Sequence, residues 1–248
     1  MTRTLVVTGG SRGIGAACAR LGAAAGWAVC LSYRASERAA NAVVADIERA
    51  GGRALAVASD VSSERDVITL FDRAQAAFGQ VTGLINNAGI VAAASRLANI
   101  ELDRWNAIIA TNLTGSFLCA REAVRRMAES AGGAGGAIVN VSSMAAVLGA
   151  PHEFIDYAAS KGAVDALTIG LAKEVAADGI RVNGVRPGLI DTDIHAASGD
   201  AGRAARLAPS VPMQRVGTAD EVARTILWLL SDEASYCTGV TINVSGGR

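Results

Sequence analysis

Three residues in the second half of the chain have the types and spacing needed for proton transfer. Tyr157 and Lys161 occur in the run DYAASK, and Ser143 precedes Tyr157 by fourteen positions. Helical positions four apart share a face, so we expect the Lys161 ammonium within Coulomb range of the Tyr157 phenol, where it favours the ionised form. A free tyrosine has a pKa near ~10, and a lowered pKa would make it a better proton donor at neutral pH. Tyr and Lys at this spacing also occur on ordinary solvated helices, so the rest of the chain must decide.

The elements that would position these residues alternate along the chain. Short β-rich runs are expected as strands at 4–8, 28–33, 54–59, 83–86, 137–142, 181–186 and 240–244. Helical periodicity occupies 14–25, 37–50, 63–78, 101–128, 155–178 and 219–231. Strands separated by helices imply right-handed crossovers and a parallel sheet covered on both faces. The pattern predicts one α/β domain over residues 1–248, a doubly wound parallel sheet of about seven strands with helices on both faces.

Composition narrows the function classes. Lys plus Arg and Asp plus Glu number 23 each, so no global field would attract nucleic acid or an anionic membrane, and we expect neither partner. The chain shows no signal-peptide layout and no apolar run long enough to span a bilayer, so a cytoplasmic location is expected. We expect the four scattered cysteines, Cys18, Cys30, Cys119 and Cys237, to be buried and reduced. His152 and His195, the only histidines, lack ligand partners, so no metal site is expected.

A glycine-rich turn directly follows the first predicted strand. The run TGGSRGIG spans residues 8–15, with Gly9, Gly13 and Gly15 spaced as GxxxGxG, and a helical pattern begins at Ala16. Glycines permit a tight turn and close approach of the backbone, and the N–H groups at a helix N-terminus attract a pyrophosphate. This context predicts a dinucleotide site in a Rossmann-type fold.

The end of the second predicted strand indicates which dinucleotide binds. An NAD-selective site would offer a carboxylate there, but Tyr33 is followed by Arg34, and Arg12 lies within the glycine turn. Two guanidinium groups converging on a 2′-phosphate would select NADP(H). Taken singly, each arginine is equally consistent with a solvated surface residue.

Further motifs follow in order along the chain: Asp60-Val61, the run NNAG at 86–89, Asn112 in TNLTG, Ser143 in NVSS, the YAASK run, and Pro187-Gly188 followed by Thr192. With these motifs the chain closely resembles the short-chain dehydrogenases/reductases across essentially its whole length. The resemblance implies catalysis by Asn112, Ser143, Tyr157 and Lys161. The cofactor residues that it and the glycine turn imply are Gly9, Ser11, Arg12, Gly13, Ile14, Gly15, Tyr33, Arg34, Asp60, Val61, Asn87, Ala88, Gly89, Tyr157, Lys161, Pro187, Gly188, Ile190 and Thr192, with Ile90 beside the nicotinamide.

The resemblance also implies a role for each catalytic residue. Tyr157 would exchange a proton with a carbonyl or alcohol oxygen as hydride moves, and Lys161 would lower the phenol pKa and bind the nicotinamide ribose. Ser143 would orient the substrate oxygen and stabilise the charge that develops on it. Asn112 would hold a water that links Lys161 to solvent.

Two segments depart from the pattern of the family. The interval from Ser143 to Tyr157 is one residue longer than in many members, so we expect the loop at 151–154 to bulge toward the substrate. The tail reads VSGGR where relatives often have VDGG, which can alter a subunit contact. Residues 194–212 are either an ordinary mobile loop or a lid over the substrate.

Several functional alternatives stay open. We expect an oxidoreductase acting on a small carbonyl compound or secondary alcohol, with 3-oxoacyl-[acyl-carrier-protein] reductase or glucose 1-dehydrogenase-like activity as alternatives. An acidic carrier protein calls for a basic docking patch, and the runs AESAGGAGG and AADG offer no Lys or Arg where one is expected. A non-catalytic NADP-binding sensor is an alternative of another class. We expect a homotetramer or a homodimer, because the predicted helices at 101–128 and 155–178 have wide apolar faces. Members of the family associate through these helices.

Overall fold

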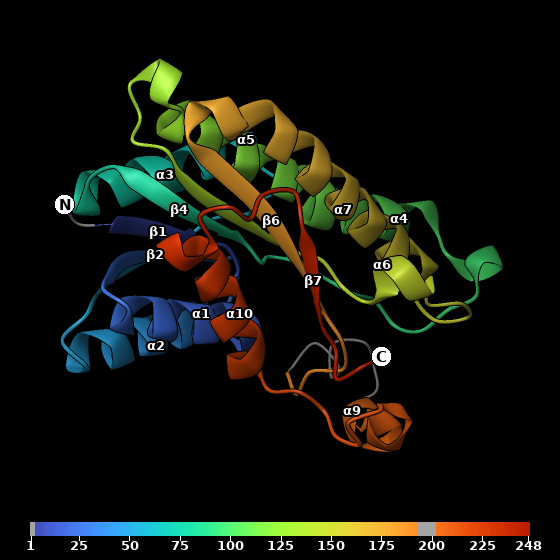
Figure 1. Ribbon diagram of the computed structural model, residues 1–248. Helices are drawn as coiled ribbons and strands as arrows, with labels where there is room; N and C mark the ends of the chain where they lie inside the picture. The colour runs from blue at the N-terminus through green and yellow to red at the C-terminus, as the bar shows by residue number, and fades with distance from the viewer. Residues whose placement is uncertain (1–2, 193–201) are drawn as a thin grey trace.

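The protein is built around one parallel β-sheet. Its computed structural model describes residues 3–192 and 202–248. The strands are β1 (Arg3–Val7), β2 (Trp27–Tyr33), β3 (Arg53–Ala58), β4 (Val81–Asn86), β5 (Gly136–Val141), β6 (Ile180–Pro187) and β7 (Thr241–Val244). They lie in the order β3-β2-β1-β4-β5-β6-β7, and every neighbouring pair is parallel (Figure 1). The doubly wound parallel sheet expected from the sequence is therefore confirmed.

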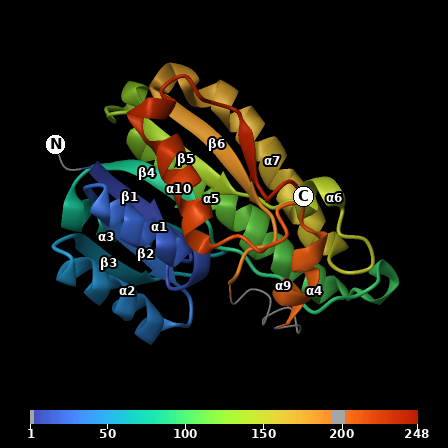
Figure 2. The same ribbon diagram turned by 60° about the horizontal axis from the view of Figure 1, so that its bottom comes forward.

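Helices cover both faces of this sheet. The longer ones are α1 (Gly13–Ala24), α2 (Glu37–Arg49), α3 (Glu64–Phe78), α4 (Leu102–Ile109), α5 (Gly115–Met127), α7 (Ile155–Val175) and α10 (Ala219–Leu230), with shorter turns at α6 (Ala145–Leu148) and α9 (Arg203–Leu207). Helices α1, α2 and α10 lie on one face, and α3, α5 and α7 lie on the other (Figures 1 and 2). The long crossovers that parallel strands need supply these two helical layers.

The central strands contain runs of consecutive apolar residues because both of their faces are buried. In β1, Leu5 and Val7 belong to the core beneath α1 and α10, whereas Val6 belongs to the core beneath α3 and α5. In β5, Val139 and Ile138 divide between the same two cores. Successive side chains of a strand point to opposite faces, so a strand covered on both sides is largely apolar and does not alternate with polar positions.

Three segments differ from the sequence-based expectation. The single helix predicted over 101–128 is divided by a π-helical turn at Ala110–Thr114, which separates α4 from α5. A short helix, α6, lies in the segment after β5 for which no element was predicted, and α9 lies within the predicted lid. A π-turn depends on a local change from i+4 to i+5 hydrogen bonding, which leaves no signature in hydrophobic periodicity.

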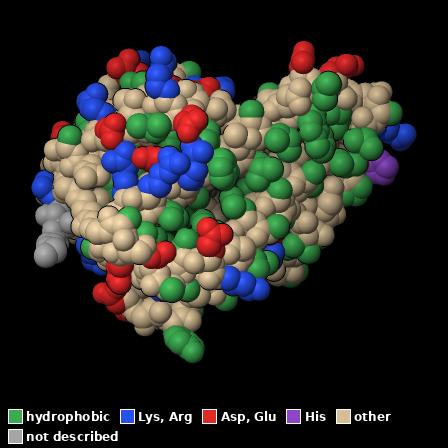
Figure 3. All heavy atoms as spheres, turned by 90° about the horizontal axis from the view of Figure 1, so that it is seen from above, with side chains coloured by type: hydrophobic (Ala, Val, Ile, Leu, Met, Phe, Trp, Pro, Cys, Tyr) green, Lys and Arg blue, Asp and Glu red, His purple; other side chains and the backbone are tan. Residues whose placement is uncertain are grey.

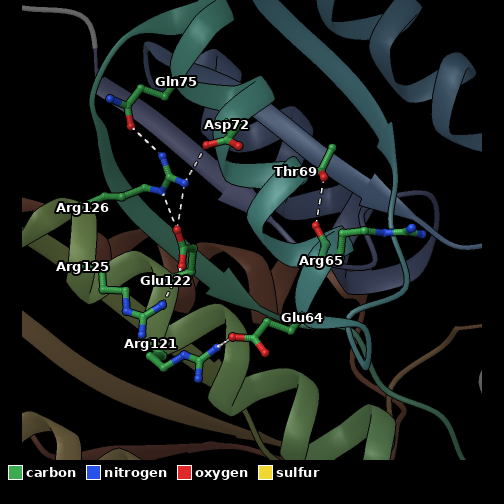
Figure 4. Close-up of polar contacts among 9 residues, drawn as sticks. All are labelled: Glu64, Arg65, Thr69, Asp72, Gln75, Arg121, Glu122, Arg125 and Arg126. Carbon is green, nitrogen blue, oxygen red and sulfur yellow. Dashed lines mark hydrogen bonds and ion pairs between the residues drawn. The ribbon is translucent and has the colours of Figure 1, made fainter.

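A network of charged side chains joins α3 to α5 (Figure 4). The Arg126 guanidinium donates to Asp72 at 2.8 Å, to Gln75 at 3.0 Å and to Glu122 at 2.8 Å. Further along the same two helices, Arg121 pairs with Glu64. A connected network of this kind holds its helices more firmly than isolated surface pairs do. It fixes α5 in place, and α5 begins directly after the π-turn.

Candidate active site

The carboxyl ends of the strands open into a cavity of about 450 Å³. It lies where the chain leaves β1 between β2 on one side and β4 on the other, the point at which ligands bind in open α/β sheets. The predicted residues that line it are Gly9, Ser11, Arg12, Gly13, Ile14, Tyr33, Arg34, Asp60, Val61, Asn87, Ala88, Gly89, Ile90, Ser143, Tyr157, Lys161, Pro187, Gly188, Ile190 and Thr192. The fold therefore brings most of the predicted site together.

Other lining residues were missed in the sequence. They are Ser32, Ala35, Ser36, Ser59, Val91, Thr111, Val141 and Ser142. Most of them lie at or just beyond the carboxyl ends of β2, β3, β4 and β5, so the rule that ligands bind at strand ends would have found them. Thr111 is the exception, because it belongs to the π-turn, which the sequence did not reveal.

Hydrogen bonds between loops hold the glycine turn in place. Asn87, after β4, donates from its side chain to the carbonyl oxygens of Thr8 at 2.9 Å and Gly9 at 3.1 Å. Gly9 and Gly13 have φ angles of 64° and 53°, in the left-handed region that favours glycine. No side chain caps the N-terminus of α1, which begins at Gly13, so its first N–H groups face the cavity rim and are available to an anion.

Gly15 has a different position from the one expected. It does not line the cavity, although the glycine pattern groups it with Gly9 and Gly13. A Cβ at Gly15 would lie 2.3 Å from the carbonyl oxygen of Gly9 and 2.5 Å from the side-chain nitrogen of Asn87. Because Gly15 has no side chain, α1 can pack closely against the turn. Gly15 therefore supports the conformation of the turn from the side away from the cavity.

The end of the cavity at β2 and β3 carries two arginines and one carboxylate. Arg12 and Arg34 both line it and are exposed, and no acid stands at the end of β2. Hydrogen bonds from Ser62 to the Asp60 carboxylate lower the pKa of Asp60, and the nearby charge of Arg34 adds to this effect. The two guanidinium groups therefore border the same end of the cavity, beside a carboxylate that stays ionised.

The side chains predicted to be catalytic come from α7 and from the segment after β5. Tyr157 and Lys161 lie one turn apart on α7, with the Lys161 nitrogen 5.7 Å from the centre of the Tyr157 ring. Lys161 is buried, and its Nζ donates to the carbonyl oxygen of Val141 at 2.7 Å. Ser143 follows β5 and borders the cavity with them. The fold thus places a phenol, an ammonium and a hydroxyl around one point.

The electrostatics of Tyr157 differ from the sequence-based expectation. Burial raises the pKa of the Tyr157 phenol above 10, and the side-chain interaction with Ser143 opposes this effect only in part. The expected lowering by Lys161 is therefore not found in the protein without ligands. Desolvation of the phenolate outweighs the attraction of an ammonium that is committed to Val141. The phenol consequently remains protonated at neutral pH.

Burial also changes the charge of Lys161. It lowers the pKa of Lys161 from 10.5 to about 8, and the charge of Asp165 opposes the shift. Asp165 lies one turn further along α7 and is paired with Arg186 of β6 at 2.8 Å. Lys161 therefore keeps most of its positive charge at neutral pH and loses it above about pH 8.

The lowered pKa of Lys161 predicts how stability depends on pH. Between about pH 8 and 10.5 the unfolded chain binds more protons than the folded one, so the free energy of unfolding rises with pH in this window. Relative to Lys161→Met, which removes the titration, the native chain should gain on the order of 3 kcal/mol across the window. Urea unfolding of both chains at several pH values measures the gain. Parallel pH profiles for the two would contradict it.

Asn112 lies in the π-turn and ties two parts of the site together. Its side chain accepts from the N–H of Ile90 at 2.8 Å and donates to the Ile90 carbonyl at 3.0 Å and to Ser160 at 3.1 Å. It is buried behind the cavity and does not line it. A Cβ at Gly89 would lie 3.4 Å from Asn112 Oδ1 and 3.5 Å from Lys161 Nζ. Asn112 therefore holds the loop after β4 against α7 beside Lys161, and its role toward a water stays a prediction.

A buried ion pair anchors the start of α7. Arg104 of α4 donates to both carboxylate oxygens of Asp156, at 2.7 and 3.2 Å, and to the carbonyl oxygen of Ala93 at 2.6 Å. Asp156 is fully buried and also accepts from the backbone N–H of Tyr157 at 2.9 Å. This contact was missed in the sequence, where nothing links an arginine on one helix to a carboxylate 52 positions away.

A second cavity, of about 220 Å³, adjoins the first. Its lining is Val91, Ser143, Met144, Ala145, Leu148, Ala150, Pro151, Glu153, Phe154, Tyr157, Pro187, Gly188, Leu189, Arg203 and Arg248. The bulge expected at 151–154 therefore does border this space, although the side chain of His152 is not part of the lining. Part of the predicted lid, together with His195, lies outside the described residues. The described part includes α9, whose Arg203 pairs with Glu153 at 2.7 Å.

Ser143 and Tyr157 line both cavities, so one pair of hydroxyl groups stands where the two spaces meet. A nucleotide-sized cavity at the switch point of a doubly wound sheet, joined to a smaller chamber through these hydroxyls, is typical of oxidoreductases that use a nicotinamide cofactor. Among the described residues, no group of His, Cys, Asp and Glu side chains could hold a metal ion.

Comparisons with known proteins agree with this class. A family described as "Enoyl-(Acyl carrier protein) reductase" matches residues 9–248. The chain is 51% identical over 243 residues to "Uncharacterized oxidoreductase YgfF" of Escherichia coli (strain K12), covering 98% of each chain. It is 44% identical over 247 residues to "3beta-hydroxysteroid dehydrogenase 1" of Eggerthella lenta, covering 99% of this chain and 93% of that one.

A solved structure shares the whole fold. The crystal structure of 3-ketoacyl-(acyl-carrier-protein) reductase from Brucella melitensis complexed with NADH superposes with a TM-score of 0.91 at 32% identity, covering 99% of this chain and 98% of that one. The chain therefore belongs to the short-chain dehydrogenase/reductase family of oxidoreductases, which bind a nicotinamide cofactor.

Proposed function

We propose that the protein is an NADP(H)-dependent oxidoreductase that transfers hydride between nicotinamide and a carbonyl or secondary alcohol of a small substrate. The observation that carries this proposal is the position of Ser143 and Tyr157 at the junction of the two cavities. The larger cavity, with its glycine turn and free helix N-terminus, suits the dinucleotide, and the smaller chamber suits the substrate.

In the direction of reduction, the bound nicotinamide supplies the hydride that reaches the carbonyl carbon. Tyr157, whose phenol is protonated at neutral pH, gives its proton to the carbonyl oxygen. Ser143 donates a hydrogen bond to the same oxygen and stabilises the charge that develops there. Lys161, charged below about pH 8, stabilises the phenolate left behind. The oxidation of an alcohol follows the same steps in reverse.

A substrate screen tests this proposal. NADPH oxidation is followed by absorbance with ketones, 3-oxoacyl thioesters and quinones, and NADP⁺ reduction is followed in parallel with alcohols and sugars. We expect turnover with at least one carbonyl compound or alcohol. Binding of NADPH without turnover of any class would instead support the alternative of a non-catalytic NADP-binding sensor.

A carrier-linked 3-oxoacyl substrate is the second candidate, because the matching family and the Brucella structure both have names of acyl-carrier-protein reductases. Comparison of a 3-oxoacyl group on acyl-carrier protein with the same group on a small thiol separates the two functions. We expect no preference for the carrier, since the segments before β5 and β6 offer no basic docking patch. Glucose 1-dehydrogenase-like activity is tested by the sugars of the screen.

The choice between NADP(H) and NAD(H) depends on Arg34 in this proposal. Replacing Arg34 with alanine should raise the KM for NADPH about 10- to 100-fold, the loss expected for one charge-assisted hydrogen bond to a phosphate. The KM for NADH should change little, because NADH has no 2′-phosphate. Arg38→Ala removes an equal charge from an exposed position of α2 outside the cavity and is the matched control. An equal rise in KM for both cofactors would show that Arg34 does not bind the 2′-phosphate.

We also propose a homotetramer, with a homodimer as the smaller alternative. Figure 3 shows the side of the molecule on which α5 and α7 lie, where hydrophobic side chains cover one half and charged ones gather on the other. Phe117 on α5 and Ile169 on α7 are 43% and 45% exposed and could pack against a second copy of the chain. A monomeric mass by light scattering would contradict this. No described helix is long and apolar enough to cross a membrane, and the cytoplasmic location stays a prediction.

A further inference from the structure

The second cavity contains charges that hydride transfer does not require. Besides Ser143 and Tyr157, the described residues that line it include three charged ones: Glu153 from the bulge, Arg203 from α9 and Arg248 from the tail. The rest of its wall is largely apolar, from Val91, Met144, Leu148, Pro151, Phe154 and Leu189. A substrate bound here would therefore place an apolar body against this wall, with its reacting carbon near Tyr157.

One of the two arginines is already satisfied within the protein. The Arg203 guanidinium donates to both oxygens of Glu153 at 2.7 Å each, and it stacks over the ring of Phe154 at 5.1 Å. Its side chain is only 13% exposed. A bidentate, stacked and largely buried arginine of this kind is part of the wall, and it neutralises the carboxylate of Glu153.

Arg248 is the remaining charge. Among the described residues, no carboxylate forms an ion pair with its side chain, yet its charge contributes to the lowered pKa of Glu153, behind the larger effects of Arg203. Of the three charged side chains in the described lining, two are cationic and one is anionic. A guanidinium that has no ion-pair partner in the described part of the chain, beside apolar walls, is suited to an anionic ligand group.

The residues that precede Arg248 form a hydrogen-bonded turn. Gly246 and Gly247 have φ angles of 65° and 93°, which glycine adopts without strain. The turn is closed by the Ser245 hydroxyl, which donates to the carbonyl oxygen of Arg248 at 3.0 Å, and it is held from outside by Met213, whose N–H donates to Gly246 at 3.1 Å. Arg248, which lines the chamber, therefore follows an ordered turn.

We propose that the substrate carries a carboxylate in addition to its carbonyl or hydroxyl group, and that Arg248 binds this carboxylate. The inference rests on the proposed function, because it assigns the second cavity to the substrate. Arg248 is then a specificity-determining residue, and the substrate is an oxo acid or hydroxy acid with an apolar body. A thioester-linked acyl chain, which carries no free carboxylate, would leave Arg248 unpaired.

Matched acids and esters test the proposal. Straight-chain oxo acids of several lengths, with the oxo group next to the terminal carbon, are compared with their methyl esters as substrates. For the length that spans the chamber, the acid should have a kcat/KM about 10- to 100-fold above its ester, the range for one charge-assisted hydrogen bond. Arg248→Gln should remove this preference by raising the KM of the acid, with kcat and the ester little changed. Arg224→Gln, an equal loss of charge on exposed α10, should preserve it.

Binding measured without turnover separates this inference from the proposed function. Saturation-transfer NMR compares straight-chain alkanoates with their methyl esters on the native chain and on Arg248→Gln, both with NADP⁺ bound. Acids that bind better than esters through Arg248, but whose oxo forms are never reduced, would support the carboxylate site and overturn the proposed function. Reduction of acids and esters at equal kcat/KM, or an equal loss for both in Arg248→Gln, would overturn the carboxylate site and leave the proposed function intact.

Discussion

Tyr157→Phe is expected to lower kcat by about 10²- to 10⁴-fold on whichever carbonyl compound the native protein reduces best, the range that a positioned proton donor contributes. The change removes one oxygen from a ring that is held on α7, so the fold and the affinity for NADPH should persist. Steady-state kinetics at saturating NADPH measure the effect, and quenching of protein fluorescence by NADPH checks that binding is retained.

The matched control for this prediction is Tyr236→Phe. The side chain of Tyr236 is completely exposed and lies outside both cavities, so the same chemical change should leave kcat within about twofold. If Tyr157→Phe retained native turnover on every active substrate, Tyr157 would not be the proton donor and the proposed mechanism would be wrong.

Arg104→Leu should destabilise the folded protein by about 3–5 kcal/mol, the cost of removing one partner of a buried ion pair. Asp156, which is fully buried, would lose both hydrogen bonds from the guanidinium and keep only the one from the N–H of Tyr157. Urea unfolding followed by circular dichroism measures the loss. Because Asp156 directly precedes Tyr157, we also expect kcat to fall at temperatures where the variant is still folded.

Two further variants make the stability prediction specific. Arg65→Leu removes an arginine whose side chain is 92% exposed and whose contact with Asp66 is long, so it should cost less than about 0.5 kcal/mol. Combining Arg104→Leu with Asp156→Asn removes the stranded charge and should recover part of the loss. If Arg104→Leu were no more destabilising than Arg65→Leu, the buried pair would not anchor the start of α7.

The sequence predicted the fold well because its signals are local. Strands such as β1 have runs of consecutive apolar residues, and the intervening segments have helical periodicity, which together favour a parallel sheet with two helical layers. In such a sheet, the loops at the carboxyl ends of the strands gather at one edge. This rule brings Gly9, Asn87 and Ser143 together, although they lie far apart in the chain.

The roles of individual side chains were less predictable. Gly15 matches the glycine pattern but acts from behind the turn, because its neighbours come from the turn itself and from the loop after β4. Asn112 is buried behind the cavity by a π-turn that periodicity does not reveal. The role of each residue depends on which atoms of other segments lie next to it. Sequence spacing predicts neighbours only within one helix or strand.

By itself, the sequence determined the order of the elements, the glycine turn at the switch point, and the presence of Tyr157 and Lys161 one turn apart on a helix. Only the tertiary structure decided how these two groups titrate and what stands around them. Burial raises the pKa of Tyr157 and lowers that of Lys161, the reverse of what their spacing alone suggests for the phenol. Burial depends on the packing of the whole fold, and the contact between Arg104 and Asp156 joins residues that are distant in the chain. Local sequence patterns therefore predict neither of them.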